Sequence, residues 1–469
     1  MTTSPATVRS EKAVLFIIFF SGLISALNTG LLYVAYLTLA DVFQTDLNTV
    51  QWLTAIFTLT SAMVTPTAGY FAKRHSLRKM LMFSFVLLCL ASLCCALSPN
   101  IYCLIASRAV QGMAAGLMTP LSLAIIYQWI PREKQGMYLS ISLAGMSLGP
   151  AIGPSLSGFL LAVLDWHAIF ICNIPVALVN LVLVYDVLPR EEGAHAEPVD
   201  VKNIALVFIG TLLILLSIYE AGSIGWQNMW IWLGCAIGVI ILCCFTRAQL
   251  RSPRPLADFH LFRIRPFAIS IVVSAILYVN VTLIAFLMPV FLESGRGMTP
   301  LSAGTLLFFP AIGMALATPV AGRVYKNCSA RTLLIAGLSV MLAGTLLVTT
   351  FDTETPLAAI IAILAVRYIG AAFANVPSLD YGLGALPKEK ASDGTALNNW
   401  IKSICISLSL TIFTALYSLG ENHYLTHHEG AASAEAAVYV NSVLFWLQGA
   451  TILFALLLIL FATPRRHKQ

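Results

Sequence analysis

Four charged residues lie inside long apolar stretches of this sequence, namely Arg108, Arg367, Lys402 and Asp380. A charge at the centre of a membrane helix costs about 2.5 kcal/mol or more, so such side chains usually face a protein interior or a water-filled cavity. A carboxyl group held in so apolar a place can load and release protons near neutral pH. We therefore predict that Asp380 and Arg108 couple proton movement to the function of this protein.

Each of these charges also has a simpler interpretation. The three basic residues could be packing charges whose long side chains reach a membrane interface. Asp380, which follows Pro377 in the same apolar stretch, could instead pair with Lys402 and only hold two helices together. The sequence leaves these interpretations open.

The elements that carry these charges are predicted membrane helices. A bilayer core about 30 Å thick needs about 20 mostly apolar residues in helical form. With 59% hydrophobic and 10% charged residues, the chain offers such stretches repeatedly. We predict fourteen spans, at residues 14–38, 50–72, 78–97, 101–129, 137–164, 167–188, 203–221, 228–246, 267–292, 302–323, 331–350, 356–386, 395–418 and 438–462.

The basic residues outside these spans fall in every second gap, and Arg296 alone falls in the gaps between. Short loops rich in Lys and Arg stay on the cytoplasmic side of a membrane, so both termini are predicted to be cytoplasmic. The net charge of +6 reflects this loop bias. No basic run is interleaved with aromatic residues as single-strand binders require, so no nucleic-acid partner is expected.

An internal repeat links Arg108 to Arg367. Each is followed by small residues, a proline and a similar exit, Pro131–Lys134 in the first copy and Pro387–Lys390 in the second. Repeated halves are a common architecture of secondary transporters, which move one half against the other. We predict an N-terminal six-helix half at 1–188, a linker and inserted two-helix hairpin at 189–250, and a C-terminal six-helix half at 251–469.

Several stretches together resemble a known family over nearly the whole chain. They are Gly69–Lys79, Leu104–Gly112, Gly145–Pro154, Asp165–Phe170 and Pro255–Asp258. They are similar to motifs of the major facilitator superfamily, and within it of the fourteen-span drug:proton antiporters of EmrB/QacA type. The resemblance implies an all-α integral membrane protein with the major facilitator fold, in which 14 transmembrane helices form two six-helix repeats plus an inserted helix pair. The stretch Gly145–Pro154 resembles the span 5 antiporter motif and implies export.

Two of these stretches are predicted to act in gating. Glycines at every fourth position line one helix face and allow a neighbouring helix to approach closely, while prolines permit a bend. The basic turn after span 2 could pair with helix ends and act as a latch. The alternatives are a static packing face and a purely topological basic turn, since Lys73 stands where the superfamily usually has an acid. The predicted gating residues are Gly69, Lys73, Arg74, Arg78, Gly145, Gly149, Pro150, Gly153 and Pro154.

The predicted substrate site is polar, aromatic and basic. Drug-exporting relatives usually carry an Asp in the middle of span 1, where this chain has Asn28, whose amide cannot take up a proton. A basic interior without that carboxylate favours neutral or anionic amphiphiles over lipophilic cations. The predicted substrate-binding residues are Asn28, Tyr33, Gln111, Tyr278, Asn280, Arg367, Asn399 and Lys402.

The predicted function is therefore proton-coupled efflux of small amphiphilic organic molecules by alternating access. No phosphate-binding loop, nucleophile elbow or metalloprotease motif is present, so we expect no enzyme activity, cofactor or metal. Alternatives are a carrier of an organic anion, such as a siderophore or carboxylate, and a transport-inactive sensor. The expected partners are the substrate, protons, membrane lipid and, if the resemblance holds in full, a periplasmic adaptor protein. The expected location is the inner membrane.

Overall fold

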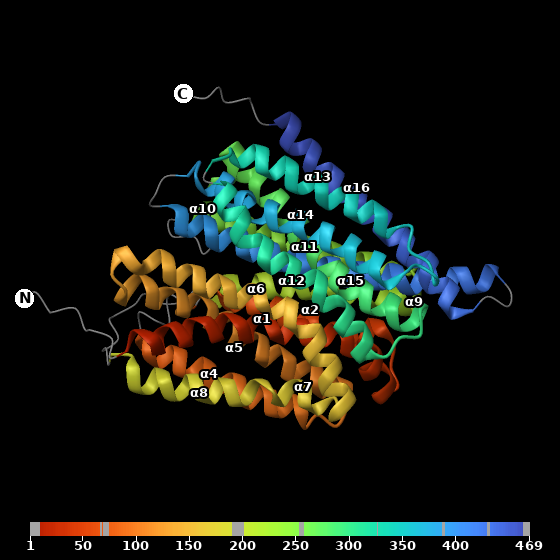
Figure 1. The fold of residues 1–469 in the computed structure, drawn as a ribbon, viewed down its shortest axis with the longest axis horizontal. Coiled ribbons are helices and arrows are strands. Elements are labelled where there is room, and N and C mark those ends of the chain that lie inside the picture. The colour runs from red at the N-terminus through yellow and green to blue at the C-terminus, as the bar shows by residue number, and fades with distance from the viewer. Residues whose placement is uncertain are drawn as a thin grey trace, which may run out of the picture. The chain divides into compact units, whose positions relative to one another are not determined.

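The predicted all-helical membrane architecture is confirmed in the part of the chain that the structure describes (Figure 1). The computed structural model describes residues 10–65, 68, 75–189, 201–252, 258–325, 327–386, 390–428 and 432–462. Within these residues no strand occurs, and eleven helices are long and apolar enough to cross a membrane. Contacts divide the chain into two compact units, Met1–Phe208 and Ile209–Gln469.

The first unit holds the first repeat. Helix α1 packs against α6, α2 against α5, and α4 against both α5 and α8. The helices are α1 (Glu11–Val42), α2 (Leu47–Val64), α4 (Leu77–Ala96), α5 (Ile101–Trp129), α6 (Arg132–Val163), α7 (His167–Ile171) and α8 (Asn173–Val187). Helix α9 (Val201–Ile224) begins in this unit and continues into the second.

The second unit repeats much of this arrangement. Helix α14 packs against α11, α12 and α13, while α16 packs against α13 and α15. Its helices are α10 (Met229–Arg251), η2 (Phe259–Arg263), α11 (Arg265–Val290), η3 (Phe291–Gly295), α12 (Pro300–Tyr325), α13 (Ala330–Val348), α14 (Leu357–Leu383), α15 (Ala391–His427) and α16 (Ser433–Ala462). Of these, η2 is a 3₁₀ helix and η3 a π-helical turn.

Local sequence sets where many of these helices begin. Short polar side chains accept a hydrogen bond from a backbone N–H of the first turn, which would otherwise lack a partner. Ser10 accepts from Ala13 in α1, Asp46 from Thr49 in α2, and Asn100 from Cys103 in α5. These caps fix where the helices start, and thereby which turn of each helix carries the interior polar residues.

Each unit has its own apolar core. In the first unit Phe85 and Leu121 lie among aliphatic residues of α1, α4, α5 and α8. In the second unit Leu338 and Ile452 belong to a core formed by α11, α13, α14 and α16. The outward faces of many helices remain apolar, which suits contact with lipid acyl chains. Each core therefore surrounds the few polar residues that lie within it.

Candidate functional site

Arg108 is fully buried, with 0% of its surface exposed, and its guanidinium joins three helices of the first unit. Its Nε donates to the carbonyl of Leu53 on α2 at 3.0 Å, and Nη2 donates to the carbonyl of Asn28 on α1 at 3.1 Å. Its Nη1 donates to Gln111 Oε1 on α5 at 2.6 Å, and its Cζ lies 4.2 Å from the centre of the Phe57 ring. Each guanidinium nitrogen thus has a partner, and the side chain does not reach an interface.

The residues around Arg108 are themselves held in place. Gln111 donates from Nε2 to the hydroxyl of Ser92 on α4 at 2.8 Å. Asn28 donates to the carbonyl of Ile24, and its Oδ1 accepts from Asn173 on α8 at 3.1 Å. The structure therefore brings three of the predicted site residues, Asn28, Arg108 and Gln111, into one network. Buried polar networks that are fully paired hold a unique arrangement.

Arg367 occupies the equivalent position in the second unit and is also 0% exposed. Its Nε donates to the hydroxyl of Thr345 on α13 at 2.9 Å. Its Nη2 donates both to the carbonyl of Asn280 on α11 at 3.0 Å and to Gln448 Oε1 on α16 at 2.9 Å. The predicted pair Arg367 and Asn280 is therefore in direct contact.

The two clusters follow one plan. In each unit a buried arginine donates to the backbone carbonyl of an asparagine, on α1 in the first unit and on α11 in the second, and that asparagine's amide donates to the carbonyl four residues earlier. Both clusters also contain supporting residues that were not predicted from the sequence, namely Ser92, Asn173, Thr345, Gln448 and Thr451. All are polar residues inside apolar segments, and that property was the signal that could have found them.

A second group of predicted substrate residues meets in the second unit. The Lys402 Nζ lies 3.7 Å from the centre of the Tyr278 ring, a distance at which an ammonium is attracted to the aromatic face. Lys402 also donates to Asn399 Oδ1 at 3.2 Å. Tyr278 comes from α11, and Asn399 and Lys402 come from α15. These three half-buried side chains form a cationic and aromatic group that is partly open to solvent.

Two further predicted residues have clear positions in the first unit. The Tyr33 ring lies edge-on to that of Tyr36, with 6.0 Å between ring centres, and is 5% exposed. Arg78 does not lie free in a loop: it is 7% exposed, donates to the carbonyl of Tyr185 on α8, and has its Cζ 5.0 Å from the Tyr185 ring centre. Arg78 thus ties the start of α4 to the end of α8.

The glycine stretch of α6 forms a close seam with α1. A Cβ placed on Gly145 would meet the carbonyl oxygen of Phe19, and one on Gly153 would lie 2.7 Å from the carbonyl carbon of Gly30. A Cβ on Gly149 would lie 2.7 Å from the carbonyl carbon of Ala26. Real side chains do not approach backbone atoms so closely, so this seam depends on glycine along its length. Pro154 is buried in the same helix.

Some predicted residues lie outside the described part of the chain. Gly69, Lys73 and Arg74 are not described at all. Pro150 lies in α6 and Asp380 in α14, but their side chains are not described. Their roles therefore stay predictions.

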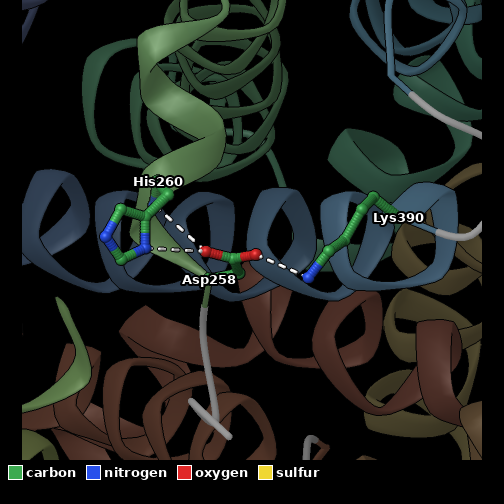
Figure 2. A network of polar contacts seen from close by, with 3 residues as sticks. All are labelled: Asp258, His260 and Lys390. Carbon is green, nitrogen blue, oxygen red and sulfur yellow. Dashed lines mark hydrogen bonds and ion pairs between the residues drawn. The ribbon is translucent and has the colours of Figure 1, made fainter. Parts of the chain in front are cut away.

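Asp258 holds together two segments at one end of the second unit (Figure 2). Its carboxylate caps the helix η2 by accepting from the backbone N–H of His260 at 3.2 Å, and the Nδ1 of His260 lies 3.2 Å from the same oxygen. The other oxygen accepts from Lys390 Nζ at 2.9 Å. The Asp258 side chain is 11% exposed, whereas that of Lys390 is 46% exposed.

The same tie occurs in the first unit. Lys134 lies at the place in the sequence repeat that Lys390 occupies in the second copy. Its Nζ lies 2.6 Å from the carboxylate of Glu11, the first residue of α1, and both side chains are largely exposed. An acid–lysine pair therefore joins the start of α1 to the start of α6 in the first unit, and the start of η2 to the start of α15 in the second.

The Asp258 contact predicts a defined pH dependence. Burial raises the pKa of the Asp258 carboxyl, but the hydrogen bonds from Lys390 and from the backbone N–H of His260 outweigh it and hold that pKa below its ordinary value. A lowered folded-state pKa means that the contribution is present above the unfolded-state pKa of about 3.9 and is lost as pH falls through the folded-state value. We expect Asp258→Ala to lower stability by about 1 kcal/mol, as other cap removals do. Thermal unfolding should show a constant difference from wild type between pH 7 and pH 5, which shrinks below about pH 4.

Asp41→Ala is the matched control, because Asp41 is an exposed carboxylate near the end of α1. It should leave the thermal midpoint unchanged at every pH. If the thermal midpoints of Asp258→Ala and wild type differed by the same amount down to pH 3, the stabilisation would not depend on the charge of the carboxylate.

Comparison with known proteins agrees with this architecture. A profile of the Major Facilitator Superfamily matches residues 18–410. The Riboflavin transporter RibZ of Clostridioides difficile (strain 630) is 25% identical over 467 residues, which cover 98% of this chain and 100% of that protein. The Lincomycin resistance protein LmrB of Listeria monocytogenes serovar 1/2a is 25% identical over 410 residues, which cover 87% of each chain.

Solved structures show the same fold. The crystal structure of peptide transporter POT in complex with sulfate matches with a TM-score of 0.70 at 16% sequence identity, over 98% of this chain and 97% of that one. At this level of identity the likeness concerns the fold alone.

Proposed function

Because the chain belongs to the Major Facilitator Superfamily, we propose that it is a proton-coupled secondary active exporter, an antiporter, of small amphiphilic organic molecules. As a member of that superfamily it is a transporter and not an enzyme, and its many apolar helices make it a multi-pass protein of the cell membrane. We further propose the EmrB/QacA type, with fourteen spans, both termini in the cytoplasm, and location in an inner membrane. The alternating gaps of Lys and Arg support this orientation.

The observation that carries the export proposal is the glycine seam between α1 and α6. The stretch Gly145–Pro154 resembles the antiporter motif, and Gly145, Gly149 and Gly153 each face the α1 backbone too closely for any side chain. Two helices in such contact move together or separate as a unit, because packed interfaces are bistable and do not deform continuously. A seam of this kind suits a gate that closes during alternating access.

The proposed substrate is an amphiphile that is neutral or anionic. Tyr278, Asn399 and Lys402 together offer an aromatic face, an amide and a cation, which suit a flat ring with polar substituents. Among the described residues Arg108, Arg367 and Lys402 form no ion pair, so no protein carboxylate described here offsets their charge. The relatives named for riboflavin and lincomycin support a small organic molecule as the substrate.

Proton coupling is proposed to rest on Asp380 and, as a second proton-coupling residue, on Arg108. The test is proton flux in proteoliposomes with an imposed pH gradient, on adding tetraphenylphosphonium, riboflavin or citrate in turn. Wild-type protein should move protons when riboflavin is added and not when tetraphenylphosphonium is added, and Asp380→Asn should lose that flux while remaining folded and inserted. An amide cannot take up a proton at this pH, so the loss should be complete.

Asp352→Asn is the control for this experiment, because Asp352 is an exposed carboxylate in the loop between α13 and α14. It should transport like wild type. Unchanged proton coupling in Asp380→Asn would remove Asp380 from the mechanism, and flux that no added compound evokes would contradict the antiporter itself.

A second candidate function is a carrier of an organic anion, such as a siderophore or carboxylate. It is favoured by the same uncompensated positive side chains of Arg108, Arg367 and Lys402 in the described part of the chain. Flux evoked by citrate alone would select this function over export of neutral amphiphiles. A periplasmic adaptor protein is proposed as a further partner only if the antiporter needs one to move its substrate in intact cells.

A further inference from the structure

The Arg367 cluster contains buried polar atoms that the protein leaves without a hydrogen-bond partner. They are Nη1 of Arg367, Nε2 of Gln448 and Oδ1 of Asn280. Arg367, Gln448 and Asn280 are each 0% exposed. An unpartnered polar group in such a place costs about 1 to 3 kcal/mol, and more when it is charged. Other buried side-chain atoms of the described residues also lack a partner, but these three belong to residues that are joined to one another through Arg367.

The Arg108 cluster, which follows the same plan, shows no such atom. None of the buried polar side-chain atoms of Arg108, Gln111, Asn28 or Asn173 lacks a partner. The difference has a local cause. In the first unit Asn173 donates to Oδ1 of Asn28, whereas in the second unit the hydroxyl of Thr451 accepts from Nδ2 of Asn280 and leaves Oδ1 open.

The hydrogen bonds fix which open atoms are donors and which is an acceptor. Gln448 accepts from Arg367 through Oε1, so its open atom is the Nε2 donor. Asn280 donates from Nδ2 to Ile276 and Thr451, so its open atom is the Oδ1 acceptor. Amide orientation is set by such networks. The cluster thus presents two open N–H donors and one open acceptor.

We propose that the Arg367 cluster is a binding site for a hydroxyl group, supplied either by an ordered water molecule or by a transported alcohol. A hydroxyl oxygen accepts hydrogen bonds from Arg367 and Gln448, and its proton is donated to Asn280. A cation is repelled by the guanidinium. A fully ionised anion has no proton to donate to Oδ1 of Asn280. That oxygen would then lie unpaired beside a negative charge, which is energetically unfavourable.

Three hydrogen bonds are what a buried guest of this kind normally makes. Buried water molecules in proteins make about three hydrogen bonds to polar groups that are otherwise unpaired. The three open atoms match the number and kind of partners that one oxygen needs, and their meeting at one oxygen is part of the proposal. A hydroxyl site here would extend the substrate role proposed for Arg367 and Asn280 and would add Gln448 to it. Only the version in which the hydroxyl belongs to a transported alcohol rests on the proposed function.

The test uses Gln448→Glu in the full-length protein. The glutamate has almost the shape of glutamine, but its carboxylate pairs with Arg367 in a two-point contact and replaces the Nε2 donor. Both open donors are then gone. An experimental structure in lipid nanodiscs, at a resolution that shows water, should reveal a density peak within hydrogen-bond distance of Arg367 and Gln448 in wild type. The peak should be missing in Gln448→Glu.

Gln111→Glu is the matched control in the first unit. It supplies the same carboxylate to Arg108, whose nitrogens already have partners, and should leave the peak beside Arg367 in place. A wild-type structure in which the open atoms of Arg367, Gln448 and Asn280 turn to protein partners, with no peak between them, overturns the proposal. A peak that persists in Gln448→Glu overturns it as well.

A binding measurement separates the two sources of the hydroxyl. Riboflavin carries a hydroxylated ribityl chain, and lumichrome has a similar tricyclic ring without that chain. If the transported alcohol supplies the hydroxyl, wild type should bind riboflavin about tenfold more tightly than lumichrome, as one or two added hydrogen bonds allow, and Gln448→Glu should lose the preference. Equal binding, or binding of neither compound, assigns the observed peak to water.

The outcome is independent of whether the export proposal succeeds. If wild-type proteoliposomes show no proton flux with any compound, the proposed function fails while the peak beside Arg367 can still be present. If flux is present and no peak is found, the hydroxyl site fails while the antiporter stands.

Discussion

Gly149→Ala should destabilise the protein by about 2 kcal/mol, although alanine favours a helix over glycine. The added methyl group would lie 2.7 Å from the carbonyl carbon of Ala26 on α1, and no flexible side chain can move away to make room. Helices α1 and α6 must therefore separate along a seam that also includes Gly145 and Gly153. The thermal midpoint of the purified protein, followed by tryptophan fluorescence, should fall. Transport measured just below the wild-type midpoint should fall as well.

Gly313→Ala is the matched control, since Gly313 also lies within a long helix, α12. There a Cβ would lie 3.8 Å from that of Ala365, which is ordinary van der Waals contact. This variant should keep the wild-type midpoint or raise it, because alanine has the higher helix propensity by about 1 kcal/mol. Gly149→Ala and Gly313→Ala with equal midpoints would show that the seam is not tightly packed in the membrane.

Arg108→Lys should cost about 3 kcal/mol of stability while keeping the positive charge. The guanidinium places its three nitrogens against acceptors on three helices, namely Leu53 on α2, Asn28 on α1 and Gln111 on α5. A lysine carries a single nitrogen, which cannot reach acceptors spread in this way, so at least one buried acceptor is left unpaired. The measurement is again the thermal midpoint, combined with the yield of monodisperse protein.

Arg263→Lys provides the comparison, because Arg263 is exposed at the end of η2. It should leave stability unchanged. A midpoint for Arg108→Lys that equals the wild-type value, together with lost proton coupling, would mean that the guanidinium serves proton coupling and is not needed to join the three helices.

The interior position of Arg108 and Arg367 could be inferred from sequence because lipid makes a buried charge costly. The repeat of their flanking residues also indicated that the two units share one plan. The hydrogen-bond partners of these arginines could not be inferred from the sequence. Thr345 and Gln448 contact Arg367 from segments distant in the chain, and sequence alone does not say which face of a helix meets which neighbour.

Arg78 illustrates the same limit. Its place in a basic turn predicted a gating role, which stays a prediction, and its contact with Tyr185 at the end of α8 was not predicted from the sequence. In the same way Asp258 belonged to a motif without an assigned role, and its ties to His260 and Lys390 emerged only when η2 and the start of α15 were brought together. Long polar side chains have many partners within reach, and chain folding selects among them.

The sequence by itself determined that this protein is a bundle of membrane helices built from two related halves. Hydropathy and loop charge are local properties, and the bilayer acts on each segment separately. The tertiary structure alone decided that Asn28 completes the Arg108 cluster while Asn280 leaves the Arg367 cluster open. That difference depends on the rotation of each helix and on one partner, an amide in α8 or a hydroxyl in α16. Helix rotation is set by packing among all neighbours at once, so no single segment encodes it.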